Sequence, residues 1–166
     1  RALDRLLSRG QELEKNGDLK GALTNYTAVL EEVPDHEEAA SLKERLEARL
    51  NEGQDLRRVA DEHIGEGAWE QAAAVLKQLG GLFPDDEDIR KKSDLANANL
   101  ATIEGAIARA TDALRRKRYD LVGQAAREVL LISPNHGEAL AAQKDAERGL
   151  AGIEKQLEEA KELIDS

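Results

Sequence analysis

Residues 17–38 read GDLKGALTNYTAVLEEVPDHEE, residues 67–88 read GAWEQAAAVLKQLGGLFPDDED, and residues 117–138 read KRYDLVGQAAREVLLISPNHGE. The three segments start 50 residues apart, and the same offset aligns further positions along the chain. The aligned sets include Pro34, Pro84 and Pro134; Leu19, Trp69 and Tyr119; and Leu50, Leu100 and Leu150. Agreement of this length at one offset indicates an internal repeat. We therefore expect a single repeat domain over residues 1–166, with repeats of about 1–50, 51–100 and 101–150, and with 151–166 as a partial fourth repeat or a capping helix.

A short helix is expected in each repeat, between a turn and the proline. The turns contain Gly17, Gly67 and the pair Lys117-Arg118, and glycine suits the left-handed residue that ends many helices. About 14 residues of helical pattern follow each turn, and proline disfavours helical geometry in the residue before it. The predicted short helices are Leu19–Val33, Trp69–Phe83 and Tyr119–Ser133.

A long helix is expected after each proline. Asp35, Asp85 and Asn135 are suitable N-caps, and each has an acidic residue three positions later, as in a capping box. Apolar residues then recur at helical spacing, which predicts helices of about 30 residues and roughly 45 Å. These helices are His36–Ile64, Glu87–Arg116 and His136–Ile164. Gly53 and Gly152 are weak points where we expect a helix to bend or fray.

The composition favours helix over strand independently of the pattern. Hydrophobic residues make up 40% of the chain, and much of this share is alanine and leucine, whereas Trp, Phe and Tyr are nearly absent. Alanine and leucine are strong helix formers, and aromatic and β-branched residues favour strands. We therefore predict an all-α fold, a helical repeat solenoid in which short and long helices alternate.

The helix–turn–helix part of each repeat resembles the tetratricopeptide repeat. That family has apolar and small residues on its first helix, an alanine and an aromatic on its second, and a closing proline. The matching residues are Leu6, Gly10, Leu13, Ala22, Tyr26 and Pro34; Leu56, Val59, Ala60, Ala72, Leu76 and Pro84; and Ala106, Ala110, Ala113, Val122, Ala126 and Pro134. A partial fourth match begins near Glu154 and includes Ala160 and Leu163. The resemblance covers most of the chain and implies a scaffold that binds other proteins.

The repeat is longer than that of the family. The family's period is 34 residues, so a period of 50 adds about 16 residues to the helix after each proline. Either these helices project from an otherwise ordinary superhelix, or they run from one three-helix bundle into the next as an extended rod. Of the two, we favour the superhelix. A contact between the helices at residues 19–33 and 69–83 would support it, and the absence of that contact would support the rod.

The charge and the apolar content exclude several classes of partner. A formal net charge of -10 disfavours nucleic acid and an anionic membrane surface, which both attract Lys and Arg. The one basic run, residues 115–118, lies at a predicted helix end, where cations are favourable. No apolar run approaches the roughly 20 residues of a membrane helix, and we expect no signal peptide. The chain has no Cys or Met and begins at Arg1, so we expect a cytoplasmic, soluble fragment of a longer protein.

The residues that usually carry chemistry do not form a recognisable site. His36, His63 and His136 are the only histidines and no cysteine accompanies them, so zinc has no ligand set. The acidic residues 85–88 lack the spacing of a calcium loop, and they lie at a helix start, where acids are favourable anyway. Phosphate loops, dinucleotide fingerprints and nucleophile elbows are absent as well. We therefore expect no enzymatic activity, no metal and no cofactor.

The inner groove of the solenoid is the binding surface that the resemblance implies. Its residues would be Leu7, Gln11 and Glu14; Arg57, Asp61 and Ile64; and Ile107, Thr111 and Leu114. The paired lysines and asparagines with which some family members hold a C-terminal carboxylate are missing here. A partly apolar groove suits an amphipathic helix or an extended peptide. Alternatively, these side chains pack against the long helices.

Three function classes remain open at this point. The first is an adaptor that docks a protein or peptide partner. The second is a structural module that assembles with copies of itself into a homo-oligomer. The third is a regulatory appendage of an enzyme encoded elsewhere in a longer chain.

Overall fold

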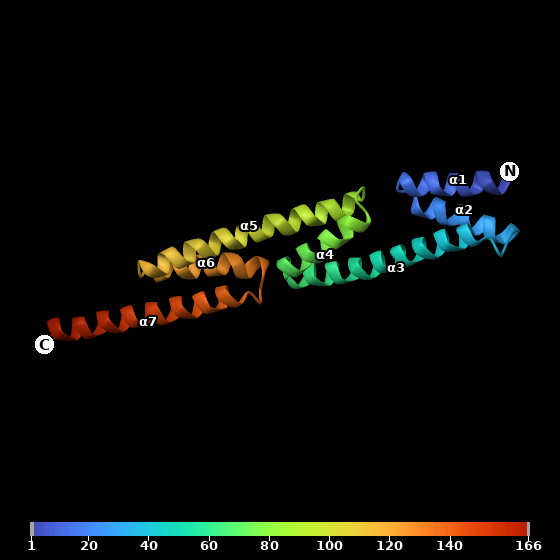
Figure 1. Ribbon diagram of the computed structural model, residues 1–166. Helices are drawn as coiled ribbons and strands as arrows, with labels where there is room; N and C mark the ends of the chain where they lie inside the picture. The colour runs from blue at the N-terminus through green and yellow to red at the C-terminus, as the bar shows by residue number, and fades with distance from the viewer. Residues whose placement is uncertain (1, 166) are drawn as a thin grey trace. The chain divides into compact units, whose positions relative to one another are not determined.

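The computed structural model describes residues 2–165 of the chain. These residues form seven α-helices and no β-strand, which confirms the predicted all-α class (Figure 1). The helices are α1 (Ala2–Lys15), α2 (Leu19–Glu32), α3 (Glu37–Glu66), α4 (Trp69–Leu82), α5 (Glu87–Arg115), α6 (Tyr119–Ile132) and α7 (Gly137–Asp165).

The turns that end α1, α3 and α5 share one conformation. In the first, the N–H of Gly17 donates to the carbonyl of Glu14, and the N–H of Asp18 donates to the carbonyl of Leu13, at 3.1 and 2.9 Å. This pair of bonds is the Schellman motif, which needs a left-handed residue. Gly17 and Gly67 have the predicted positive φ, of 84° and 68°. Lys117 adopts the same conformation at φ 56° although it carries a side chain.

The caps of the long helices lie one residue later than predicted; α3 and α7 also begin one residue late, whereas α5 begins at Glu87 as predicted. The N–H of His36 donates to the carbonyl of Val33 at 3.1 Å, so Asp35 belongs to a β-turn with proline at its second position and is not the N-cap. The Nδ1 atom of His36 instead accepts the N–H of Ala39 at 3.3 Å. Equivalent contacts make Asp86 and His136 the caps of α5 and α7, in place of Asp85 and Asn135. Histidine therefore caps two of the long helices.

The two expected weak points lie inside continuous helices. α3 runs through Gly53 and α7 runs through Gly152. The ring of Phe83 occupies the place where a Cβ on Gly53 would lie, and Gly53 is buried. This glycine therefore allows a close approach of an aromatic side chain, whereas the space around Gly152 is open.

The chain divides into two compact units. Unit 1 consists of the residues up to Val59 together with Val75–Lys91. Its core contains Leu19, Tyr26 and Leu46, with Leu7 and Phe83 among the partly buried residues packed against it. Tyr26 is fully buried, and its ring lies where a Cβ on Gly10 would be. Unit 1 therefore has a core of large side chains that depends on two glycines, Gly10 beside Tyr26 and Gly53 beside Phe83.

Unit 2 consists of Ala60–Ala74 and the chain from Lys92 onward. Its core cluster is Ala113, Val122 and Ala146, and α6 packs along α7. A Cβ on Gly123 would lie 3.5 Å from the Cβ of Ala146, which is ordinary van der Waals contact. This cluster of unit 2 is therefore built from small side chains, although unit 2 also buries Trp69 and Ile103.

Candidate docking surface

The nine residues predicted to line a groove are distributed over both units. Leu7, Gln11, Glu14 and Arg57 belong to unit 1, and Asp61, Ile64, Ile107, Thr111 and Leu114 belong to unit 2. They lie on α1, α3 and α5. Each group is described within its own unit.

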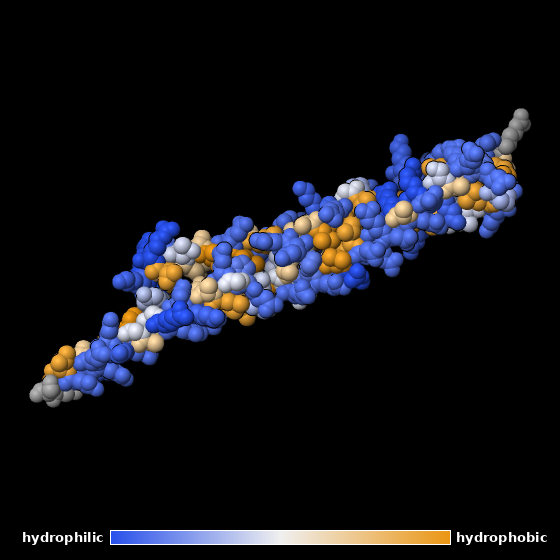
Figure 2. Space-filling view, turned by 60° about the horizontal axis from the view of Figure 1, so that its bottom comes forward, coloured by the Kyte–Doolittle hydropathy of each residue, from blue (hydrophilic) through white to orange (hydrophobic). Residues whose placement is uncertain are grey.

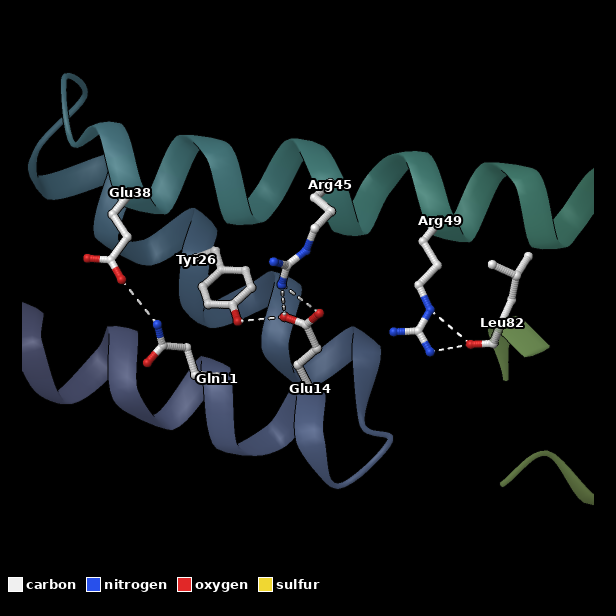
Figure 3. A network of polar contacts seen from close by, with 7 residues as sticks. All are labelled: Gln11, Glu14, Tyr26, Glu38, Arg45, Arg49 and Leu82. Carbon is white, nitrogen blue, oxygen red and sulfur yellow. Dashed lines mark hydrogen bonds and ion pairs between the residues drawn. The ribbon is translucent and has the colours of Figure 1, made fainter. Parts of the chain in front are cut away.

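Glu14 is the centre of a polar network in unit 1 (Figure 3). Its carboxylate accepts the Tyr26 hydroxyl at 2.9 Å and the Arg45 guanidinium at 2.9 and 3.1 Å. The side chain of Glu14 is only 15% exposed. Burial, reinforced by the hydrogen bond to Glu14, raises the pKa of Tyr26 to about 12. Glu14 therefore serves the fold of unit 1, because it satisfies a buried hydroxyl.

The other α1 positions also contact residues of unit 1. The Gln11 side-chain amide donates to Glu38 at the start of α3, at 3.1 Å (Figure 3). Leu7 packs against the core cluster around Tyr26. The face of α1 that carries these residues is thus occupied by internal contacts.

Arg57 binds the cap of α5. Its guanidinium pairs with the Asp86 carboxylate at 2.8 Å and lies over the Phe83 ring, 5.1 Å from the centroid. Burial opposes ionisation of Asp86, but hydrogen bonds from the Ile89 N–H and from Arg57 outweigh it and hold the pKa of this carboxyl below its usual value. Arg57 therefore holds the cap of α5 in place, a structural role that the sequence did not predict.

The sequence also did not predict the contacts that Arg49 makes with Phe83 and that Trp69 makes with Ile132. Arg49 lies over the Phe83 ring at 5.3 Å, and its Nε donates to the carbonyl of Leu82 at 2.9 Å (Figure 3). In unit 2, Trp69 Nε1 donates to the carbonyl of Ile132 at 2.8 Å. The sequence shows that Phe83 and Trp69 are aromatic residues. The groups that they contact lie in other segments of the chain, and no local pattern predicts those contacts.

The predicted residues of unit 2 differ in accessibility. Asp61 pairs with Lys92 at 2.8 Å, and Ile64 and Ile107 are half-buried. Thr111 is exposed, although its hydroxyl donates to the carbonyl of Ile107 at 2.9 Å, and Leu114 is 37% exposed. Thr111 and Leu114 are therefore the most accessible of the predicted apolar or hydroxyl residues.

Arginines line a concave region of unit 2 between α5 and α6. Its lining includes Arg109, Arg116 and Arg118. Each pairs with an acid: Arg109 with Glu128 at 2.6 Å, Arg116 with Asp112 at 3.1 Å, and Arg118 with Asp120 at 3.3 Å. The hydrogen bond from Arg118 lowers the pKa of the exposed Asp120 carboxyl. The pairs of Arg116 and Arg118 offset part of the positive charge of the basic run at residues 115–118.

Exposed hydrophobic residues lie among a mostly hydrophilic surface (Figure 2). Leu131 on α6 is 87% exposed. On α7, Leu157 is 56% exposed and Ile164 is 83% exposed. The most exposed apolar side chains of unit 2 therefore lie not at the predicted groove but at Leu131 on α6 and at the end of α7.

Neither a cluster of metal ligands nor a membrane-spanning helix is found among residues 2–165. Among residues 2–165, no group of three or more His, Asp or Glu side chains is placed to hold a metal ion. None of the described helices combines the length and the apolar character needed to cross a bilayer. The tetratricopeptide resemblance stays a prediction. Comparison of the chain with models of known families, with curated protein sequences and with solved structures gave no match.

Proposed function

We propose that the chain is a non-catalytic protein–protein interaction scaffold of the tetratricopeptide type, which docks a peptide or a partner helix on α5. The observation that carries this proposal is a contrast between two faces at equivalent repeat positions. Leu7 and Glu14 on α1 are engaged inside unit 1 and the exposed Gln11 is hydrogen-bonded to Glu38 of α3, whereas Leu114 on α5 is 37% exposed and the exposed Thr111 bonds only to the carbonyl of Ile107 in its own helix. An exposed side chain can contact a partner without first releasing an internal contact.

The spacing on α5 suits a helical or extended partner. Ile107, Thr111 and Leu114 are four and three residues apart, so they lie on one face of the helix. Two apolar side chains with a hydroxyl between them match an amphipathic helix or a peptide with alternate apolar residues. Because the accessible area is small, we expect a transient complex of modest affinity.

The repeat solenoid is part of the same proposal. The helix lengths support it, since α2, α4 and α6 have 14 residues each and α3, α5 and α7 have 29 or 30. The Schellman turns at Gly17, Gly67 and Lys117 support it too. In a solenoid, each repeat buries its apolar face against the next, which leaves extended surfaces suited to binding. We therefore propose no enzymatic role.

Affinity capture with three forms of the protein tests the docking surface. The wild type, Leu114→Asp and the control Leu131→Asp would be immobilised, and the captured proteins identified by mass spectrometry. Leu131 is exposed on a different helix, so its substitution adds the same charge away from the proposed surface. We expect Leu114→Asp to lose captured proteins that the wild type and Leu131→Asp retain.

Equal capture by all three forms would refute the assignment to α5. Arg57→Glu is a less informative variant, because it breaks the ion pair with Asp86 and the contact with Phe83. Its effect on capture would combine lost folding with lost binding. Circular dichroism would show that Leu114→Asp keeps the helix content of the wild type.

Self-assembly is the second candidate function, and it is favoured by the exposed hydrophobic residues Leu157 and Ile164 at the end of α7. A regulatory role beside an enzyme stays a prediction.

A further inference from the structure

The second half of α7 exposes a row of apolar side chains. Every residue from 150 to 164 is exposed. Among them, Leu150 is 43%, Ile153 is 42%, Leu157 is 56% and Ile164 is 83% exposed. About four turns of helix therefore extend past the part of α7 that packs on α6. A helical segment of this length is marginal in water without tertiary contacts, so a partner that covers the row would stabilise it.

The spacing of this row is that of a coiled-coil seam. The positions are Leu150, Ile153, Leu157, Ala160 and Ile164, which are separated alternately by three and four residues. A heptad repeat places its a and d residues in this way, with a at 150, 157 and 164 and d at 153 and 160. We call these five residues the α7 seam.

The equivalent row on α5 is covered in part. Ile103 and Ala110 occupy the same repeat positions as Ile153 and Ala160, and they are only 6% and 4% exposed. Ile107 and Leu114, at the positions of Leu157 and Ile164, are half-buried and 37% exposed. The α7 seam is therefore more exposed than the equivalent row on α5 at each of these four positions.

Charges beside the seam distinguish between possible partners. Glu154 and Lys161 occupy the e positions that flank the a and d residues, and the g positions carry no charge. In an antiparallel pair of identical helices, e faces e of the partner, so Glu154 of each copy lies opposite Lys161 of the other. In a parallel pair, e faces g, and these charges would have no ionic partner. The pattern is thus complementary to itself in the antiparallel arrangement.

We propose that the α7 seam binds the α7 seam of a second copy of this chain as an antiparallel two-stranded coiled coil. In this register, Leu157 packs against Ala160 and Ile153 against Ile164 of the partner, and two Glu154–Lys161 pairs flank the seam. The interface has about two heptads, so it is smaller than a standard protein interface and the dimer is weak and concentration-dependent. The proposal is independent of the docking surface on α5.

Sedimentation velocity over a concentration series tests the dimer. The mass of the wild type should rise from the monomer value of 18.2 kDa toward twice that value as concentration increases. Leu157→Asp places a charge in the seam and should abolish the rise. Leu131→Asp adds the same charge at an exposed site outside the seam and should leave the rise unchanged.

Charge reversal tests the antiparallel orientation at low salt. Glu154→Lys alone, or Lys161→Glu alone, turns both ion pairs of the dimer into like-charge pairs and should weaken association by about tenfold. The double variant Glu154→Lys/Lys161→Glu restores both pairs and should recover the wild-type dissociation constant. Circular dichroism would verify equal helix content in all variants at concentrations where each is a monomer.

Three results would overturn the proposal. One is a wild type that stays monomeric at every concentration, which would leave the seam to a different partner, such as a further helix pair of the same repeat. Another is a dimer that persists in Leu157→Asp. The third is a double charge variant that associates no better than the single variants.

Discussion

The cores of unit 1 and unit 2 fill equivalent repeat positions with side chains of different size. Tyr26 and Leu46 of unit 1 correspond to Ala126 and Ala146 of unit 2, and all four are buried. Unit 1 accommodates the large residues because Gly10 leaves room for the Tyr26 ring. In unit 2, small residues on α6 and α7 bring the two helices close. The comparison shows that equivalent positions can be buried with side chains of different size when a neighbouring residue, such as Gly10, leaves the room.

The two solutions have different energetic consequences. A fully buried tyrosine removes far more apolar area from water than an alanine, at about 25 cal/mol per Å². It also brings a hydroxyl into the core, and Glu14 accepts that hydroxyl at 2.9 Å. At these positions unit 1 thus gains more from each core residue but depends on a polar partner and on glycines that leave room for the aromatic rings. Unit 2 spreads its stability over many small contacts.

Truncation of the large residue should produce the largest effect. Tyr26→Ala leaves a cavity and removes the partner of Glu14, so we expect the free energy of unfolding to fall by about 3–5 kcal/mol. Ala126→Gly at the equivalent position of unit 2 should cost only about 1 kcal/mol, mostly through helix propensity. Urea unfolding followed by circular dichroism measures both changes. Equal losses for the two variants would refute the contrast between the cores.

Alkaline pH should weaken unit 1 through the same residue. The folded-state pKa of Tyr26 is about 12 and the ordinary value is 10.0, so the unfolded chain releases this proton first. The contribution of the neutral phenol is complete below pH 10 and is lost as the pH rises toward about 12, by up to about 2–3 kcal/mol. Urea unfolding of the wild type and of Tyr26→Phe would be compared at each pH. The prediction fails if both lose stability equally between pH 10 and pH 12.

Two glycines of α7 should respond in opposite directions to alanine. The Tyr119 ring occupies the place of a Cβ on Gly149, whereas the space around Gly152 is open. Gly149→Ala should therefore destabilise unit 2 by about 1–3 kcal/mol through overpacking. Gly152→Ala should stabilise it by about 0.5–1 kcal/mol through helix propensity. Thermal unfolding of the two variants decides the matter, and a stabilised Gly149→Ala would show that the aromatic contact is dispensable.

Glycine in place of Lys117, as at the equivalent position of the other two turns, should stabilise the turn before α6. Lys117 holds a left-handed conformation at φ 56°, which glycine adopts without strain. Lys117→Gly should raise the free energy of unfolding by about 1 kcal/mol. The reverse change, Gly17→Lys, should lower it by a similar amount, because nothing crowds that position. Urea midpoints at fixed salt measure both, and a loss of stability in Lys117→Gly would contradict the strain argument.

Local sequence rules predicted most of the helix ends but not the exact caps. Gly17 and Gly67 adopt the predicted left-handed conformation because a Schellman turn involves only neighbouring residues. The cap prediction was one residue early, since proline followed by Asp or Asn forms a complete β-turn before the helix begins. That signal was present in the sequence. The docking surface was less predictable, because exposure at Thr111 and engagement at Glu14 depend on which helices lie beside them.

The sequence by itself determined the helical class, the positions of the turns and the spacing of the apolar rows, since each depends on residues within one or two helical turns. Only the tertiary structure decided the partners of Glu14, Arg57 and Trp69, which lie between 12 and 63 residues away in the chain. These contacts require two helices to meet at a particular height and rotation. Helical periodicity specifies which face of each helix is apolar, but it does not specify that register.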